Sequence, residues 1–314
     1  MRLHGFTGSS LVFRKNIPLL TPSHRILAPD LRGHGSSSKT PHGYHVSRLA
    51  MDIHELLSHL NLLPSPSSPS SPPKIRALGA SLGASILWSY TELFTSTPFS
   101  HLIFVDQSPL QNASLDGWDA RFCNRGMNSP WAIAAFQKVL ELVPKEAHRG
   151  TVGACLGYRF APLGKGGDGL GDKEEEGKRE GGKVWVQDEE FFLQEAMKGD
   201  PRWLGKLMEE HTALDWRDAV SWGLGRERSA AKVLVVASTR SGCFPAEGPL
   251  AVVGLVNGEG WKGEGEEGKK GQEGKGGRKK LARGVVVDWG GHWCYWEDEK
   301  KFNELVLGFL QEDE

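Results

Sequence analysis

Hydrophobic residues occur in short continuous runs that alternate with longer segments of helical spacing. Four runs are typical of buried strands and lie at 74–79, 101–106, 231–237 and 284–288. A further apolar run over 24–30 ends in a glycine-rich turn and is also predicted to be a strand. Strands that alternate with helices at these intervals indicate a parallel sheet, with ligand chemistry at the carboxyl ends of the strands.

Amphipathic spacing predicts the helices of the chain. It is clearest over 44–63 and at the C-terminus over 297–310. From 110 to about 225 the whole pattern is helical, with 131–143 and 191–208 as the strongest segments, so we expect a helical cap inserted between two strands. Tryptophans stand in this region at positions 118, 131, 185, 203, 216 and 222. They either line an apolar pocket or pack the cap onto the sheet.

Three low-complexity tracts interrupt the pattern. The Pro/Ser tract 64–73 is predicted to be an extended exposed spacer. The tract 164–183, built from glycine and charged residues, is expected to be disordered, and 258–280 is expected to be a solvated insertion. The expected organisation is therefore a first part of an α/β core (1–109), a helical cap (110–225) and a second part of the core (226–314).

Composition narrows the functional classes. The net charge of −1 arises from basic and acidic residues that are interspersed, so no nucleic-acid footprint is expected. Four cysteines lie far apart without a C-x-x-C pair, which favours reduced thiols in a cytoplasmic protein and gives no metal-ligand spacing. No segment approaches ~18 consecutive apolar residues, so no membrane span is expected. The expected partner is a small molecule, and neither a cofactor nor a metal is predicted.

The most informative stretch is Gly79-Ala-Ser81-Leu-Gly83, which joins a predicted strand to a predicted helix. In so sharp a turn the serine backbone is strained, and the flanking glycines are needed where a Cβ would collide. Ser81 is thereby presented to a substrate. The amide of Leu82 opens the helix, where unpaired N–H groups favour a developing negative charge, so it is a candidate for half of an oxyanion hole.

Two other loops carry polar residues next to glycines. His4-Gly5-Phe6 is either a plain polar loop or the source of a second oxyanion donor, the amide of Phe6. Asp30 and His34 suggest chemistry, but a histidine beside glycines in a turn more often bonds local backbone, and we expect both to be structural.

In order and context these motifs resemble those of the α/β-hydrolase superfamily, in particular its capped serine esterase and cofactor-free haloperoxidase-like group. The resemblance rests on His4-Gly5-Phe6, Asp30-Leu-Arg-Gly-His-Gly35, Gly79-Ala-Ser81-Leu-Gly83 and Gly291-His292. It implies a mostly parallel sheet with flanking helices and an inserted cap. It further implies Ser81 as the nucleophile, His292 as its general base and the amides of Phe6 and Leu82 as oxyanion donors.

The chain departs from the family pattern at the acid and at the start. The family's usual aspartate position is occupied by Ser241, so we expect Asp106 to orient His292, with Glu247, Asp288 or no acid as alternatives. Only three residues precede the His-Gly loop, where the family usually has further strands. We therefore expect the N-terminal strands of the fold to be missing and the strand over 24–30 to have an open edge.

The leading hypothesis is a serine hydrolase that cleaves an ester or similar small, partly apolar carbonyl compound through an acyl-enzyme on Ser81. A close variant uses the same residues for perhydrolysis, as in the cofactor-free haloperoxidases. The alternative from another class is a non-catalytic hydrolase-fold protein that binds a ligand under the cap, or a pseudoenzyme. The oligomeric state cannot be inferred from the sequence.

Overall fold

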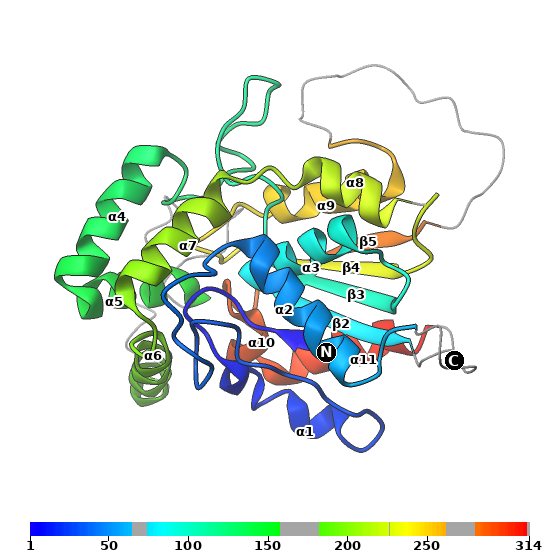
Figure 1. Cartoon of the computed structure of the whole chain (residues 1–314), viewed down its shortest axis with the longest axis horizontal. Helices are drawn as coiled ribbons and strands as arrows, with labels where there is room; N and C mark the ends of the chain where they lie inside the picture. Colours follow the sequence, from blue (N-terminus) through cyan, green and yellow to red (C-terminus); the bar gives the residue numbers. More distant parts are fainter. Residues whose placement is uncertain (65–73, 158–181, 226, 262–279, 313–314) are drawn as a thin grey trace.

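A parallel sheet of five strands forms the centre of the computed structural model, which describes residues 1–64, 74–157, 182–225, 227–261 and 280–312 (Figure 1). All neighbouring strands are parallel, and their order in the sheet is their order along the chain. The strands are β1 (Arg2–Leu3), β2 (Ile75–Ala80), β3 (Phe99–Val105), β4 (Lys232–Ser238) and β5 (Ala282–Val287). The four predicted strands are thus confirmed, although β5 is fully buried only at Ala282 and Val287, and the fold is the α/β arrangement expected.

Helices cover both faces of this sheet, which explains why its strands are apolar at nearly every position. In β3, Leu102 and Phe104 belong to one core, whereas Ile103 and Val105 belong to the other. The first core is covered by α2 (Val46–His59), α3 (Leu82–Leu93), α8 (Arg217–Leu224) and α9 (Glu247–Asn257). The second is covered by the 3₁₀ turn η1 (Ser10–Phe13), α10 (Cys294–Glu297) and α11 (Glu299–Leu310), with α1 (Ile17–Leu20) nearby (Figure 1).

The helical region between β3 and β4 projects to one side of the sheet in Figure 1. It contains α4 (Pro130–Leu142), α5 (Pro144–Cys155), α6 (Gly182–Ala196) and α7 (Pro201–Ala213), followed by α8. The prediction of a single helix over 191–208 is wrong. Asp200 caps a new helix by accepting the Trp203 N–H at 2.8 Å, and Pro201 occupies its first turn. The division into core and cap at 110 and 225 stays a prediction.

The predicted strand over 24–30 is also wrong. These residues lie beside β1, but the only backbone bond that they form with it is from Arg2 N–H to the carbonyl of Leu27, at 2.8 Å. A strand needs a ladder of such bonds, and the two-residue β1 offers too short a partner. β1 therefore forms the edge of the sheet among the described residues.

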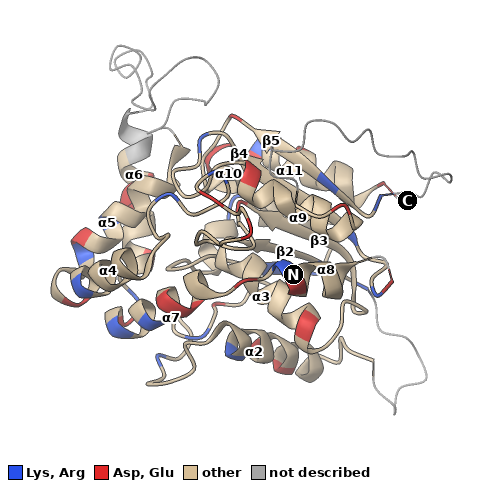
Figure 2. Cartoon of the chain, turned by 90° about the horizontal axis from the view of Figure 1, so that it is seen from above, with Lys and Arg blue, Asp and Glu red and all other residues tan. Residues whose placement is uncertain are grey.

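Other expectations concern the C-terminal helix, the low-complexity tracts and the charged surface. The helix over 297–310 is divided at Asp298, which caps α11 by accepting the Lys301 N–H at 3.1 Å. Most of each of the tracts 64–73, 164–183 and 258–280 lies outside the described residues. Basic and acidic residues stand side by side on α4, α5 and α7 (Figure 2). Within the described ranges, no helix is both long and apolar enough to cross a membrane.

Candidate active site

Ser81 forms the sharp turn between β2 and α3, with φ 52° and ψ −123°. A positive φ is strained for a residue with a Cβ and is tolerated here because the surrounding packing leaves no alternative. A Cβ on Gly79 would lie 2.4 Å from the carbonyl carbon of Gly83, and a Cβ on Gly83 would lie 2.3 Å from the carbonyl oxygen of Leu3. The predicted need for both glycines is therefore confirmed.

The His4-Gly5-Phe6 loop lies directly against this turn, since a Cβ on Gly5 would be 3.0 Å from the Cβ of Ser81. Nδ1–H of His4 donates to the Gly5 carbonyl at 2.8 Å, and Gly8 N–H donates to the same oxygen at 3.1 Å. Nε2 of His4 accepts the N–H of Leu31 at 3.0 Å, which fixes the imidazole tautomer. Hydrogen bonds at both ring nitrogens of His4 thus hold the loop in place.

This anchoring also sets the direction of the Phe6 amide. In a trans peptide the N–H points opposite to the carbonyl, so fixing the Gly5 carbonyl fixes the Phe6 N–H. Neither this N–H nor that of Leu82 donates a hydrogen bond to another group in the described ranges. Both amides are therefore free to serve a ligand beside Ser81, as the oxyanion hypothesis requires.

His292 and Asp106 are in direct contact and fully buried. Nδ1 of His292 lies 2.6 Å from Oδ2 of Asp106, with exposed fractions of 5% and 0%. Asp106 directly follows β3 with φ 48°, so Ser81 and Asp106, two of the four residues other than glycine with a positive φ in the described ranges, follow neighbouring strands. Asp106 also accepts bonds from Ser241 Oγ at 2.6 Å and from Ser238 N–H at 3.2 Å.

This geometry bears on the choice of acid. Neither Glu247 nor Asp288 forms a hydrogen bond with His292 in the described part of the chain, whereas Asp106 does. Ser241, at the position where the family usually has its aspartate, donates to Asp106 instead of replacing it. With Nδ1 engaged by Asp106, Nε2 is the nitrogen of His292 that remains for chemistry.

Ser81 and His292 line one cavity of about 240 Å³. Ser81 Oγ donates to Gln107 Oε1 at 3.4 Å, and no hydrogen bond joins it to His292 among the described residues. Apolar side chains of the cavity include Phe6, Phe136 and Met208 from the His-Gly loop and the helical region, and Phe244 and Trp293 from the segments after β4 and β5. A larger cavity of about 490 Å³ lies beside β1 and contains none of the predicted site residues.

The tryptophans of the helical region do not line the active-site cavity, as far as their side chains are described. Trp118 packs against Phe122 and Trp261, and Trp203 packs against His34. Trp131 and Trp222 are exposed. Of the two interpretations of these aromatics, packing therefore describes Trp118 and Trp203, while Trp131 and Trp222 lie on the surface. The apolar lining of the cavity comes from other residues.

Asp30 and His34, expected to be structural, form hydrogen bonds with backbone groups. The two carboxylate oxygens of Asp30 accept N–H groups of Ser10 and Ser36 at 2.7 and 2.6 Å. Nδ1–H of His34 donates to the Arg32 carbonyl at 2.9 Å. Both side chains therefore stabilise the glycine turn.

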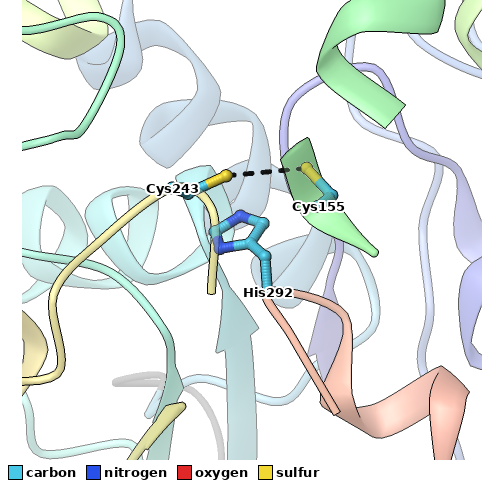
Figure 3. A group of neighbouring side chains, drawn as sticks. All are labelled: Cys155, Cys243 and His292. Carbon is cyan, nitrogen blue, oxygen red and sulfur yellow. Dashed lines mark hydrogen bonds between the residues drawn. The ribbon is translucent and has the colours of Figure 1, made fainter. Parts of the chain in front are cut away.

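Two cysteines that the sequence did not single out lie beside His292 (Figure 3). Sγ of Cys155, at the end of α5, is 3.7 Å from Sγ of Cys243 in the loop after β4. Burial lowers the pKa of His292, but the negative charges of Cys243 and Asp106 outweigh it and raise this pKa. The hydrogen bond with Cys155 and the nearby His292 lower the pKa of Cys243. With 88 positions between the cysteines, no local pattern predicts this cluster.

Comparison with known proteins agrees with this architecture. Residues 2–133 match the family model described as alpha/beta hydrolase fold. The chain is 31% identical over 118 residues to the magnesium-chelatase 30 kDa subunit of Rhodobacter capsulatus, a match over 37% of this chain and 35% of the relative. It is 43% identical over 58 residues to a soluble epoxide hydrolase of Corynebacterium sp. strain C12, over 18% of this chain and 20% of the relative. The chain thus spans about a third or less of the length of these curated relatives.

Solved structures match over nearly the whole chain. An esterase from Exiguobacterium antarcticum superposes with a TM-score of 0.72 at 15% identity, covering 99% of this chain and 91% of the esterase. A bromoperoxidase from Bacillus anthracis superposes with a TM-score of 0.67 at 16% identity, covering 99% and 91% of the two chains. At such identities the likeness concerns the fold alone.

Proposed function

Since the chain has the fold of the α/β-hydrolase superfamily, we propose that it is a serine hydrolase that cleaves a small ester or similar carbonyl compound through an acyl-enzyme on Ser81. One observation carries the proposal: the strained turn that presents Ser81 borders the same cavity as His292, whose Nδ1 is held by Asp106 at 2.6 Å. A serine, a histidine and a buried carboxylate in this arrangement are the parts of a nucleophilic triad.

In the proposed reaction the Ser81 hydroxyl turns from Gln107 toward His292 when substrate enters, because catalytic hydrogen bonds often tighten only in the complex. Ser81 Oγ attacks the carbonyl carbon while Nε2 of His292 takes its proton. The amides of Phe6 and Leu82 bind the tetrahedral oxyanion. The C–O bond to the alcohol then breaks, and the alcohol leaves with the proton from Nε2. Water repeats the sequence on the acyl-enzyme and releases the acid.

The cavity supports a substrate of modest size. Its volume of about 240 Å³ is below the range of roughly 300–1,000 Å³ found for drug-sized ligands. Phe6, Phe136 and Met208 give it an apolar side, which suits a short acyl chain. We therefore favour short-chain esters over long-chain lipids, in agreement with the partly apolar substrate expected from the sequence.

The test is hydrolysis of p-nitrophenyl acetate and butyrate together with labelling by a fluorophosphonate probe. Ser81→Ala should lower kcat/KM by roughly 10⁴-fold or more and abolish labelling. Ser85→Ala is the matched control, because it removes a buried, unbonded hydroxyl one turn further along the same helix. It should retain wild-type turnover and labelling.

The result also separates the competing functions. A folded protein that neither turns over esters nor reacts with the probe at Ser81 would overturn the enzyme proposal and favour a non-catalytic ligand-binding protein. Halide oxidation in the presence of peroxide and a carboxylic acid, abolished by Ser81→Ala, would identify the perhydrolase variant of the same chemistry.

A further inference from the structure

Three potential metal ligands converge at the edge of the active-site cavity. The Sγ atoms of Cys155 and Cys243 and a ring nitrogen of His292 all lie within 4.8 Å of one another (Figure 3). They come from three segments: the end of α5, the loop after β4 and the turn before α10. Cys155 and His292 are buried and Cys243 is half-buried, so the group borders the cavity without being fully open to solvent.

The spacing of the sulfurs fits a shared metal ion. They are 3.7 Å apart, much longer than the S–S bond of about 2.05 Å in a disulfide, so the two cysteines are not joined in a disulfide. Two thiolates that bind one tetrahedral Zn²⁺ at about 2.3 Å each lie about 3.8 Å apart. The sulfur positions therefore already match one edge of a zinc tetrahedron.

The histidine is oriented as a zinc ligand would be. Its Nδ1 bonds to the buried carboxylate of Asp106 at 2.6 Å, which leaves the Nε2 lone pair for a metal. Metal-binding histidines commonly have such a carboxylate behind the ring, where it fixes the tautomer and raises the basicity of the ligand. The same bond that serves catalysis thus also prepares His292 for coordination.

The backbone holds the three segments together without a metal. Trp293 N–H donates to the carbonyl of Cys155 at 3.3 Å, and Glu297 accepts the N–H groups of Gly157 and Gly291 at 2.9 and 2.7 Å. Nε of Arg240, in the loop after β4, donates to the carbonyl of Gly157 at 3.1 Å and links the third segment to the other two. A largely preformed site needs little reorganisation to bind a cation.

We propose that Cys155, Cys243 and His292 bind a thiophilic divalent cation, with Zn²⁺ as the best fit, and that the bound cation inhibits hydrolysis by Ser81. Binding releases to solvent the protons that the two sulfurs and Nε2 of His292 carry, and it changes no oxidation state. The fourth coordination position faces the cavity and is filled by water. Inhibition, which rests on the proposed function, follows because Nε2 of His292 cannot hold a metal and accept the Ser81 proton together.

Binding is tested on the full chain, kept reduced with a phosphine and stripped of metal, by titration with Co²⁺ and then Zn²⁺. The wild type should bind one Co²⁺ per chain and show the thiolate charge-transfer and red-visible bands of tetrahedral coordination, which Zn²⁺ removes. Cys155→Ala and Cys243→Ala should each weaken binding by roughly 100-fold or more, since loss of even an outer partner costs about 10–100-fold. Cys123→Ala, a buried cysteine packed beside Trp118 and Phe122, is the matched control and should bind as the wild type does.

Inhibition is tested separately, as the ratio of ester turnover with and without Zn²⁺ within each variant. Zn²⁺ should lower turnover of the wild type and of Cys123→Ala by a factor at least tenfold larger than that for Cys155→Ala or Cys243→Ala. Absence of thiolate bands in the wild type, or unchanged binding in both ligand variants, would overturn the site, and binding without inhibition would overturn the inhibitory role. Ser81→Ala should bind Co²⁺ normally, so failure of the esterase proposal leaves the binding result readable.

Discussion

Ser241 Oγ donates a hydrogen bond to Oδ2 of Asp106, the same oxygen that lies 2.6 Å from Nδ1 of His292. The residue that stands at the family's usual acid position therefore supports a carboxylate supplied by the neighbouring strand. Asp106→Asn should lower kcat/KM for p-nitrophenyl acetate by roughly 10³- to 10⁴-fold, because an amide at this point stabilises the wrong imidazole tautomer. Steady-state kinetics measures the loss.

Glu247→Gln and Asp288→Asn are the matched controls, since both residues are exposed acids that do not bond to His292 in the described ranges. Each should keep turnover within about twofold of the wild type. If Asp106→Asn were as active as these controls, Asp106 would have no role in orienting His292.

The contact between Ser241 and Asp106 also predicts a rescue. Introducing Ser241→Asp into Asp106→Asn returns a carboxylate to the point from which Ser241 now reaches Oδ2 of Asp106. The double variant should recover roughly tenfold of the lost turnover. Ser241→Asp alone should be impaired, because two adjacent buried carboxylates cannot both remain charged. Equal activity of the double variant and Asp106→Asn would contradict this prediction.

The turn that carries Ser81 depends on a glycine whose replacement meets backbone. A Cβ at Gly83 would lie 2.3 Å from the carbonyl oxygen of Leu3, so Gly83→Ala should lower the free energy of unfolding by about 3 kcal/mol or more. Gly308→Ala is the control within α11, where no atom other than the adjoining backbone of the helix itself lies within 4 Å of the added methyl group. It should stabilise by about 0.5–1 kcal/mol. Urea denaturation measures both, and equal midpoints would contradict the prediction.

Acid should destabilise the protein through its buried histidines. Burial lowers the pKa of His4 to about 4, and burial together with repulsion from His4 lowers the pKa of His34 to about 3. Both side chains are neutral in the folded protein. Their contribution to the free energy of unfolding is therefore fully present above the unfolded pKa of about 6.5 and is lost as the pH falls from there toward 4. Each contributes a slope of about 1.4 kcal/mol per pH unit in that window.

The variant His34→Asn isolates one of these slopes. Asparagine keeps a donor for the Arg32 carbonyl but does not titrate. Unfolding of this variant should therefore take up about one proton fewer between pH 6.5 and 4, and its free energy of unfolding should fall less steeply with decreasing pH. His59→Asn, which changes an exposed residue of α2, should keep the wild-type slope. Urea titrations at several pH values measure the slopes, and identical slopes for His34→Asn and the wild type would refute the assignment.

The apolar side of the cavity should set the preferred chain length. Phe136 lines the cavity and packs against Phe6 with ring centroids 6.4 Å apart. Phe136→Ala removes this wall, and each additional CH₂ that gains an apolar contact is worth about 0.8 kcal/mol. The ratio of kcat/KM for hexanoate over acetate esters should therefore rise roughly tenfold. Val139→Ala, on the exposed side of α4, should leave the ratio unchanged.

The sequence predicted the sheet well because its strands are buried on both sides and therefore read as continuous apolar runs, as in β3 and β4. It failed over 24–30, where an apolar run has only the two-residue β1 as a partner. It also joined α6 and α7, although Asp200 and Pro201 carry the signature of a new helix start.

Within the site, local motifs predicted the positions of Ser81, His292 and the two amides, since each lies at a glycine turn with its own signature. Asp106 could be proposed only from its place at a strand end. The approach of Cys155 to Cys243 could not be predicted, because it depends on how α5 returns to the sheet after the chain leaves β3.

The carboxylate of Glu297 holds Gly157, at the end of α5, and Gly291, next to His292, at the same time. The helical region is thereby fastened to the very turn that carries the imidazole. On this side it cannot swing away as a hinged lid without displacing His292 from Asp106. Movement of this end of α5 and the orientation of the imidazole are therefore mechanically coupled.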